Sequence, residues 1–409
     1  MRVLLIHNRY QIRGGEDVCY DNEVGLLREN GFEVREYLRD NRDITSDDAG
    51  QPLTLQTPPP HPPRKRGGGE GVGLALRTIW SNYDYRELRA VMREFQPDVA
   101  HVHNYFPLIS PALFHAAYAE GVPVVQTLHN YRLLCPAANL FRDGRVCEEC
   151  VGQTPPLPAV VYKCYRNSRG ASAAVAAMLT FHRARRTFQR RVNLFIALTE
   201  FQRRKMIAAG LHEKRVVVKP NFLHPDPGYG RSGDGYALYA GRLSPEKGIA
   251  TLTAAWRELG GEIPLKIVGE GPAEDGSRNI PGVEWLGIKS HNDVYDLLRG
   301  ALCLVIPSLC YECLPMALIE AFAVGTPVLA SRIGSLASLI RPDATGRLFT
   351  PGDARDLAKQ ARWAAANRDA LKEMGREARR EFEQRYTAAA NLQMLTGIYQ
   401  ALATGAGSE

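Results

Sequence analysis

The stretch 303–331, CLVIPSLCYECLPMALIEAFAVGTPVLAS, decides the fold because it reads as a strand, a loop, a helix and a second strand. Pro315 suits the start of a helix and Gly325 the position just after its end. Strand–helix–strand units join parallel strands by right-handed crossovers, so this stretch predicts an α/β domain with a parallel sheet. Its helix carries one carboxylate, Glu320, among apolar residues.

A buried carboxylate such as Glu320 is costly unless it accepts hydrogen bonds. A ribose diol would donate two of them, and a neighbouring arginine would satisfy the same group. Both interpretations stay open at this point. The unpaired N–H groups at the start of the same helix also form a site for an anion.

The alternation of strands and helices occurs twice along the chain, which predicts two doubly wound domains facing each other across a cleft. The first domain is expected over 1–222 and the second over 223–387, with the Pro- and Gly-rich stretch LHPDPGYGRSGDG as the linker. A C-terminal helix at about 388–404 is expected to pack back on the first domain. In the first domain, we expect strands at 2–7, 98–103, 122–129 and 192–199 and helices at 15–30, 74–96, 111–120 and 171–191.

Length and composition fit a globular protein of two domains, since the chain has 409 residues, of which 45% are hydrophobic and 23% charged. No apolar run approaches the roughly 20 residues that span a bilayer, and the N-terminus reads as a buried strand rather than a signal peptide. We therefore expect a cytoplasmic location. The net charge of +7 favours an anionic partner.

Two cations follow a predicted strand in YAGRLSPEKGI, residues 239–249. Arg242 comes directly after the strand and Lys247 lies five residues further on, at the start of the next helix. A forked guanidinium, an ammonium and helix N–H groups together suit a diphosphate. A second glycine-rich turn, VGEGP at 268–272, contains Gly269 and is a weak signal alone.

Four cysteines have the spacing C-x11-C-x2-C-x13-C within an insert at about 133–166. This spacing suits a tetrahedral structural zinc site, while free or disulfide-linked thiols and an iron–sulfur cluster are the alternatives. We expect no catalytic metal, because four protein ligands would leave no open position. The four residues are Cys135, Cys147, Cys150 and Cys164.

The chain resembles the retaining glycosyltransferases of family 4, which have the two-domain GT-B architecture. The resemblance rests on the E-x7-E pair in ECLPMALIE, on GRLSPEKG, on VGEGP, on PN at 220–221 and on GGED after the first strand. It extends over nearly the whole chain. The sequence departs from the usual pattern at Cys313 and Leu314, where glycine and phenylalanine are frequent.

The resemblance implies a role for each candidate residue. Arg242 and Lys247 would hold the donor diphosphate and stabilise the departing phosphate, Glu312 would bind hydroxyls of the transferred sugar, and Glu320 the ribose. His129 would contact the donor sugar or the acceptor. Further donor contacts are implied for Gly14, Gly15, Leu314, Met316, Gly269 and Asn221, and acceptor contacts for His103 and Asn104.

The implied activity is transfer of a sugar, with retention, from a nucleoside diphosphate donor to a hydroxyl acceptor, in cell-surface glycan or glycolipid synthesis and without a catalytic metal. The alternative is a sensor or scaffold that binds nucleotide sugars without turnover. Nucleic acid is not an expected partner, because aromatic residues do not alternate with the basic ones. The base, the sugar, the acceptor and the oligomeric state are left open.

The basic segment FHRARRTFQRRVN at 181–193 is expected to form a helix with Phe181 and Phe188 on it. A solvated helix face is one interpretation. The other is peripheral contact with an anionic membrane, at its inner face, that presents a lipid-linked acceptor.

Overall fold

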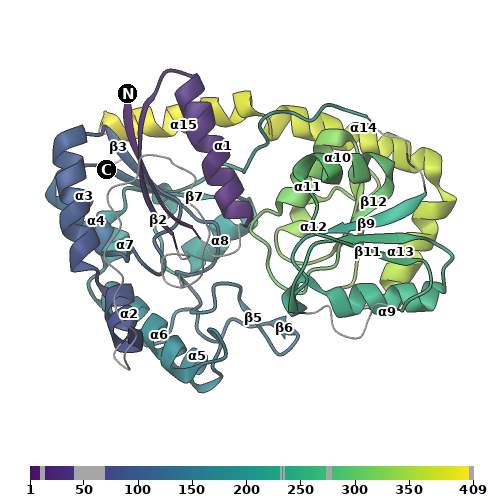
Figure 1. The fold of residues 1–409 in the computed structure, drawn as a ribbon, viewed down its shortest axis with the longest axis horizontal. Coiled ribbons are helices and arrows are strands. Elements are labelled where there is room, and N and C mark those ends of the chain that lie inside the picture. The colour runs from purple at the N-terminus through teal and green to yellow at the C-terminus, as the bar shows by residue number, and fades with distance from the viewer. Residues whose placement is uncertain (10–13, 41–69, 231–232, 234, 273–278, 405–409) are drawn as a thin grey trace, which may run out of the picture.

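The computed structural model describes residues 1–9, 14–40, 70–230, 233, 235–272 and 279–404. Two six-stranded parallel sheets lie side by side, each flanked by helices (Figure 1). The predicted fold class, two facing doubly wound α/β domains, is confirmed. The proposed boundaries at 222 and 387 stay a prediction.

The first sheet has the strand order β2-β1-β3-β4-β7-β8. Strand β1, the second from one edge, is almost wholly buried, because helices cover both faces of a parallel sheet. The direction of the order reverses between β1 and β3, and the carboxyl ends of strands at such a switch point frame a ligand crevice. The strands are β1 (Arg2–Arg9), β2 (Glu33–Asp40), β3 (Val99–Val102), β4 (Val124–Thr127), β7 (Leu194–Ala197) and β8 (Val216–Val218).

The second sheet has the order β11-β10-β9-β12-β13-β14, so its switch point lies between β9 and β12. In register, Leu304 of β12 pairs with Leu238 of β9 on one side and Val328 of β13 on the other. The strands are β9 (Tyr236–Ala240), β10 (Leu265–Val268), β11 (Val283–Gly287), β12 (Ala301–Ile306), β13 (Val328–Ser331) and β14 (Gly346–Phe349).

Helices connect the strands of each sheet. The first domain contains α1 (Gly15–Glu29), α2 (Glu70–Ile79), α3 (Asn82–Phe95), α4 (Ala112–Ala119), α5 (Leu157–Val161), α6 (Arg169–Ala184), α7 (Thr187–Arg191) and α8 (Glu200–Ala208). The second contains α9 (Ile249–Leu259), α10 (His291–Gly300), α11 (Met316–Val324), α12 (Leu336–Leu339) and α13 (Ala354–Ala366), followed by α14 (Arg368–Arg385) and α15 (Ala388–Ala403). Short 3₁₀ turns occur at η2 (Glu213–Arg215) and η3 (Pro245–Lys247), and a hairpin is formed by β5 (Phe141–Arg142) and β6 (Arg145–Val146).

Two predicted helices are each divided in the structure. The expected helix 74–96 is interrupted at Ser81, whose hydroxyl accepts from the Asp84 N–H and caps α3. The expected single helix over 181–193 is wrong, because Arg186 adopts a left-handed conformation between α6 and α7. Phe181 is 36% exposed whereas Phe188 is buried in the core, so the two rings do not share a surface.

The polypeptide passes from the first domain to the second near Leu223 and returns near Tyr386. After α14, helix α15 returns to the first domain, where Leu395 and Tyr399 pack into the same apolar cluster as β1 (Figure 1). The two crossings touch each other, because the Leu223 N–H donates to the Tyr386 carbonyl at 3.1 Å. Within the described residues, no helix is both long and apolar enough to cross a membrane.

Candidate active site between the two sheets

An ion pair occupies the switch point of the second sheet. Lys247 follows β9 and Glu312 follows β12, and the Lys247 Nζ lies 2.7 Å and 2.9 Å from the two Glu312 carboxylate oxygens. The Ser308 hydroxyl donates to the same carboxylate at 2.6 Å. Burial alone would lower the pKa of Lys247 and raise that of Glu312, but their attraction outweighs it, so the pKa of Lys247 is raised and that of Glu312 lowered. Both groups are therefore charged.

Close backbone packing holds the loop that carries Lys247 in place. A Cβ on Gly248 would lie 1.9 Å from the Pro307 carbonyl, and Gly248 has a φ of +75°, so glycine is required there. Gly269 has the same constraint, since its Cβ would lie 1.9 Å from the Gly241 carbonyl. These contacts bring the turns after β9, β10 and β12 together.

Arg242 lies on the same loop and points outward. Its guanidinium pairs with Glu246 and lies 3.3 Å from the Ser244 hydroxyl, and its side chain is 61% exposed. It also contributes to the lowered pKa of Glu312. Arg242 is thus near the Lys247–Glu312 pair without being part of it.

Helix α11 directs its N-terminus at the first domain. Pro315, its N-cap, makes no side-chain capping bond. Gly15 at the start of α1 lies directly opposite, because a Cβ there would come within 3.3 Å of Met316 Cγ. The Cys19 Sγ of α1 also lies 3.4 Å from Met316 Sδ. The starts of α1 and α11 therefore face each other across the junction.

Glu320 is buried on α11, with 7% of its surface exposed. The exposed His291 lies beside it, with its Nδ1 3.7 Å from a Glu320 carboxylate oxygen. Among the described residues, no arginine or lysine pairs with Glu320, so the structural alternative of an arginine partner is not realised there. Burial raises the pKa of the Cys19 thiol on α1, and the Glu320 charge adds to this effect.

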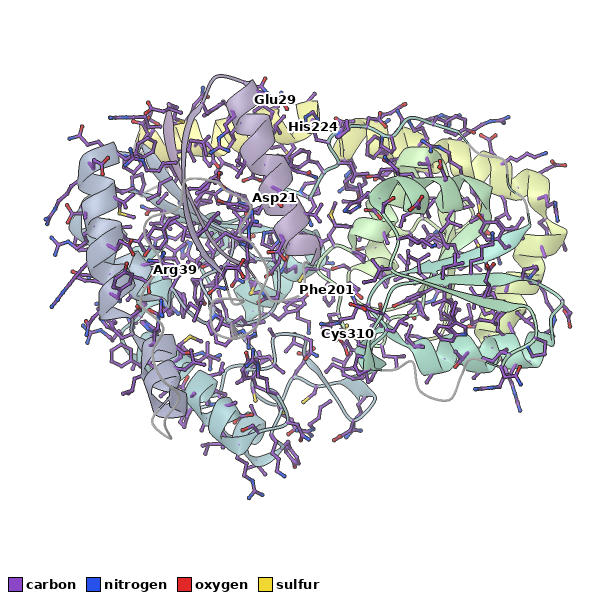
Figure 2. The ribbon with its side chains drawn as sticks, in the orientation of Figure 1. Asp21, Glu29, Arg39, Phe201, His224 and Cys310 are labelled. Atoms are coloured by element: carbon purple, nitrogen blue, oxygen red, sulfur yellow. The ribbon has the colours of Figure 1, made fainter. Side chains whose placement is uncertain are left out.

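The residues that depart from the family pattern contact the first domain. The Gln202 side chain donates to both the Leu128 carbonyl, at 2.7 Å, and the Cys313 sulfur, at 3.2 Å. It therefore connects the residue before His129 to the residue after Glu312. Nearby, the Phe201 and Tyr311 rings meet edge-to-face with their centres 4.8 Å apart, and Figure 2 shows Phe201 and Cys310 at this junction.

At the first sheet, a series of polar side chains that contact one another runs inward from His129. The His129 Nε2 lies 3.0 Å from the His103 Nδ1, and the other ring nitrogen of His103 lies 3.2 Å from Glu23. Lys219 completes the series, with its Nζ 3.0 Å from Glu23. Burial would raise the pKa of Glu23, but Lys219 and the histidines hold it well below its usual range.

His103 and His129, the two histidines of this hydrogen-bonded series, are neutral. Burial and the neighbouring imidazole of His101 lower the pKa of His103 to about 3, and burial with His103 lowers that of His129 well below its usual range. His129 is partly exposed and lines a cavity, while His103 is buried. The cavity is lined by residues 103–106, 126–130, Arg132 and Leu133.

Asn104 is held by internal hydrogen bonds. Its Nδ2 donates to the Asn8 carbonyl at 2.8 Å, and its Oδ1 accepts from the Phe106 N–H at 3.0 Å. It also donates to Glu16 at 3.1 Å. An acceptor contact through Asn104 or His103 stays a prediction, because both side chains already have partners inside the domain.

The sequence reasoning missed Glu16, which stands between Gly15 and Asp17 in GGED. Burial, followed by the adjacent Asp17 charge, raises the pKa of Glu16 to about 8, against the opposing effect of Arg132. The available signal was a carboxylate in the first turn of a helix that follows a buried strand. Lys219, a lone lysine after VVV, was likewise missed.

We expect Glu16→Gln to remove a pH dependence of stability. The folded protein keeps the Glu16 proton up to a pH of about 8, whereas the unfolded chain loses it near 4.5, so the free energy of unfolding falls between these values. Thermal melts should show the variant more stable than the wild type above that range and no more stable below it. Glu33→Gln, on the exposed start of β2, is the control. Parallel melting curves of Glu16→Gln and wild type across the range would contradict the assignment.

The remaining predicted residues fall into four places. Gly14 caps α1, and its N–H donates to Asp17 at 2.8 Å. Leu314 is buried just before α11, and Asn221 is buried on the segment that leaves the first sheet. The four cysteines are free thiols that line one small cavity, away from the other candidates.

Two facing doubly wound domains with charged side chains at their adjoining carboxyl edges have the layout of the GT-B class. Family models agree, since the glycosyl transferase 4-like domain matches residues 14–221 and the glycosyl transferases group 1 model matches residues 229–381. The chain belongs to this glycosyl transferase family, and the predicted resemblance is confirmed.

Curated relatives match over part of their length. An uncharacterized glycosyltransferase of Methanocaldococcus jannaschii is 24% identical over 196 residues, covering 46% of this chain and 55% of the relative. The glycogen synthase of Mycobacterium tuberculosis is 32% identical over 178 residues, covering 40% of this chain and 43% of the relative. The chain thus spans about half the length of the curated relatives that it matches.

Solved structures match over the whole chain and show the shared fold. HepE of Anabaena, solved in complex with UDP, has a TM-score of 0.64 at 16% identity and covers 98% of this chain and 100% of its own. Sucrose-phosphate synthase of Thermosynechococcus elongatus has a TM-score of 0.67 at 19% identity, with 98% and 99% covered.

Proposed function

We propose that this protein is a retaining glycosyltransferase that moves a sugar from a nucleoside diphosphate donor to a hydroxyl acceptor. The observation that best supports this proposal is the placement of Lys247, Glu312 and Glu320 around the N-terminus of α11, opposite the start of α1. A diphosphate suits the cations and the helix N–H groups, and a ribose suits Glu320, which pairs with no described arginine or lysine.

In the donor complex, the diphosphate would compete with Glu312 for the Lys247 ammonium. Arg242, which is exposed on the same loop, would turn toward the phosphates. The Glu312 carboxylate, released in part from Lys247, would then accept hydrogen bonds from the transferred sugar. Main-chain N–H groups at Leu314 and Met316 would add to this site, as would the backbone at Gly14 and Gly15.

The transfer step needs no nucleophile from the protein. The bond from the anomeric carbon to the diphosphate breaks, the acceptor oxygen bonds to the same face of that carbon, and the departing phosphate takes the acceptor proton. Arg242 and Lys247 would supply the charge that stabilises the leaving group, so we propose a step independent of metal. The neutral His129 would hydrogen-bond a hydroxyl at the cavity.

Related proteins support a nucleoside diphosphate sugar as donor and a role in cell-surface glycan synthesis. HepE of Anabaena has also been solved with UDP-glucose. A putative colanic acid biosynthesis glycosyltransferase of Escherichia coli is 30% identical over 177 residues. We propose a role in cell-surface glycan or glycolipid synthesis, in the cytoplasm and at the inner face of the membrane, where a lipid-linked acceptor would be met. Eight free thiols fit a reducing compartment.

The test has two stages. A thermal-shift panel of UDP-, GDP-, ADP- and TDP-sugars should identify one donor that raises the melting temperature, because a ligand of the native state stabilises it. Incubation with that donor and candidate acceptors should then give a product with the anomeric configuration of the donor, read by proton NMR. A product of opposite configuration would contradict retention. Binding with neither transfer nor donor hydrolysis would favour the nucleotide-sugar sensor instead.

A further inference from the structure

The insert at about 133–166 brings four cysteines around one cavity. Cys135, Cys147, Cys150 and Cys164 all line it, together with Ala137, Phe141, Arg142 and Ala159. All four are free thiols. Residues that lie as much as 29 positions apart in the sequence therefore converge on one point.

The insert contains little regular structure. Its regular structure consists of two strands of two residues each and the five-residue helix α5. Ala159 is the buried residue of α5, whereas Leu157, Val161 and Tyr162 are 57%, 60% and 53% exposed. The apolar burial of the insert lies in its first part, where Leu134 and Leu140 join the main core, rather than around α5.

The backbone of the insert is also strained. Ten described non-glycine residues have a positive φ, and five of them lie in this segment. Each such conformation costs about 1–3 kcal/mol and persists only where its surroundings impose it. The five are Ala138, Leu140, Asp143, Lys163 and Arg166. A crosslink at the cavity would supply that constraint.

We propose that the four cysteines bind one structural zinc ion. Binding would form four zinc–sulfur bonds and release four thiol protons to solvent, giving a closed tetrahedral site. Arg142 lines the cavity, where its positive charge would favour the resulting negative cluster. No three of the sulfurs lie within 4.8 Å of one another. Since zinc–sulfur bonds are about 2.3 Å long, the ion would draw the thiols together.

The Cys147–Cys150 turn also reaches the second domain. Between these cysteines, Glu148 pairs with Lys205 at 2.5 Å, and the Lys205 Nζ lies 5.1 Å from the centre of the Tyr311 ring. Tyr311 precedes Glu312 of the candidate donor site. In Figure 1 the β5–β6 hairpin lies below the gap between the domains and extends toward the second one. The zinc site would therefore support the donor loop through Glu148, a consequence that rests on the proposed function.

Zinc content tests the site without reference to sugar transfer. Protein purified without chelator under reducing conditions should hold about one zinc per chain by elemental analysis. Cobalt in its place should give the intense sulfur-to-cobalt absorption of a tetrathiolate. Cys147→Ser and Cys164→Ser should lose the metal, and Cys303→Ala, in the buried strand β12, should keep it.

Three results would overturn the zinc site: wild-type protein that stays metal-free after incubation with zinc, both serine variants retaining full zinc, or iron with sulfide in protein purified without oxygen. If the serine variants do not fold, zinc release from the wild type by thiol modification and its reloading after reduction decide the matter. The variant Glu148→Gln tests the link to the donor loop separately from zinc binding. It should keep zinc while weakening donor-induced stabilisation, and unchanged donor binding would refute the link to the donor loop and leave the metal site standing.

Discussion

Replacing Lys247 by alanine is expected to lower kcat for sugar transfer by about 10²- to 10³-fold, the usual effect of removing one group that stabilises developing charge. The ammonium lies at the switch point of the second sheet, where the diphosphate would depart. Steady-state kinetics with the identified donor measure the loss. Lys372→Ala, on the exposed surface of α14, is the matched control and should behave as wild type.

The same substitution also leaves Glu312 buried and without its cation, so lost activity alone would not distinguish catalysis from stability. The double variant Lys247→Met with Glu312→Gln resolves this, because it removes both charges. We expect its melting temperature to recover toward that of the wild type while transfer stays absent. Transfer at the wild-type rate in the double variant would show that the pair is structural and contradict the assigned roles.

Glu320→Ala is expected to raise KM for the donor by about 100-fold or more, because a carboxylate that accepts from both ribose hydroxyls makes two charge-assisted hydrogen bonds of about 1.5 kcal/mol or more. The change in kcat should be smaller, since these hydroxyls lie away from the reacting bond. Kinetics and thermal shift with the same donor measure both effects.

A donor analogue that lacks both ribose hydroxyls supplies the control for Glu320. The wild type and Glu320→Ala should bind it with similar affinity, because the lost interaction is already absent. If Glu320→Ala binds the analogue as much more weakly than the wild type does as it binds the full donor, Glu320 acts instead on the helix or on His291, which lies 3.7 Å away. In that case the ribose assignment would fail and the fold assignment would stand.

The fold could be predicted because its strongest signals are local. The stretch 303–331 contains a buried strand, a helix ended by Gly325 and a second strand, and the structure forms β12, α11 and β13 from it. Strand β2 was missed because its sequence, EVREYLRD, is rich in charge and lies at the edge of the sheet. The division of 74–96 depended on a cap at Ser81 rather than on hydrophobic periodicity.

The site was predictable only in part, for a physical reason. Arg242, Lys247 and Glu312 follow strands at one switch point, so the topology brings them near one another. The direct Lys247–Glu312 pair depends on side-chain geometry that spacing does not encode. The Glu23–Lys219 pair joins residues 196 positions apart, and the pair of Gln202 with Cys313 depends on how the domains meet.

The contact between Leu223 and Tyr386 has a consequence for motion. The polypeptide passes from one lobe to the other at these two points, and a main-chain hydrogen bond ties them to each other. Two lobes whose covalent connections lie side by side can rotate about that point, while the non-covalent contacts elsewhere along the junction can separate. Entry and exit of a large reactant would therefore proceed by rotation, with the greatest opening at the edge farthest from this pivot.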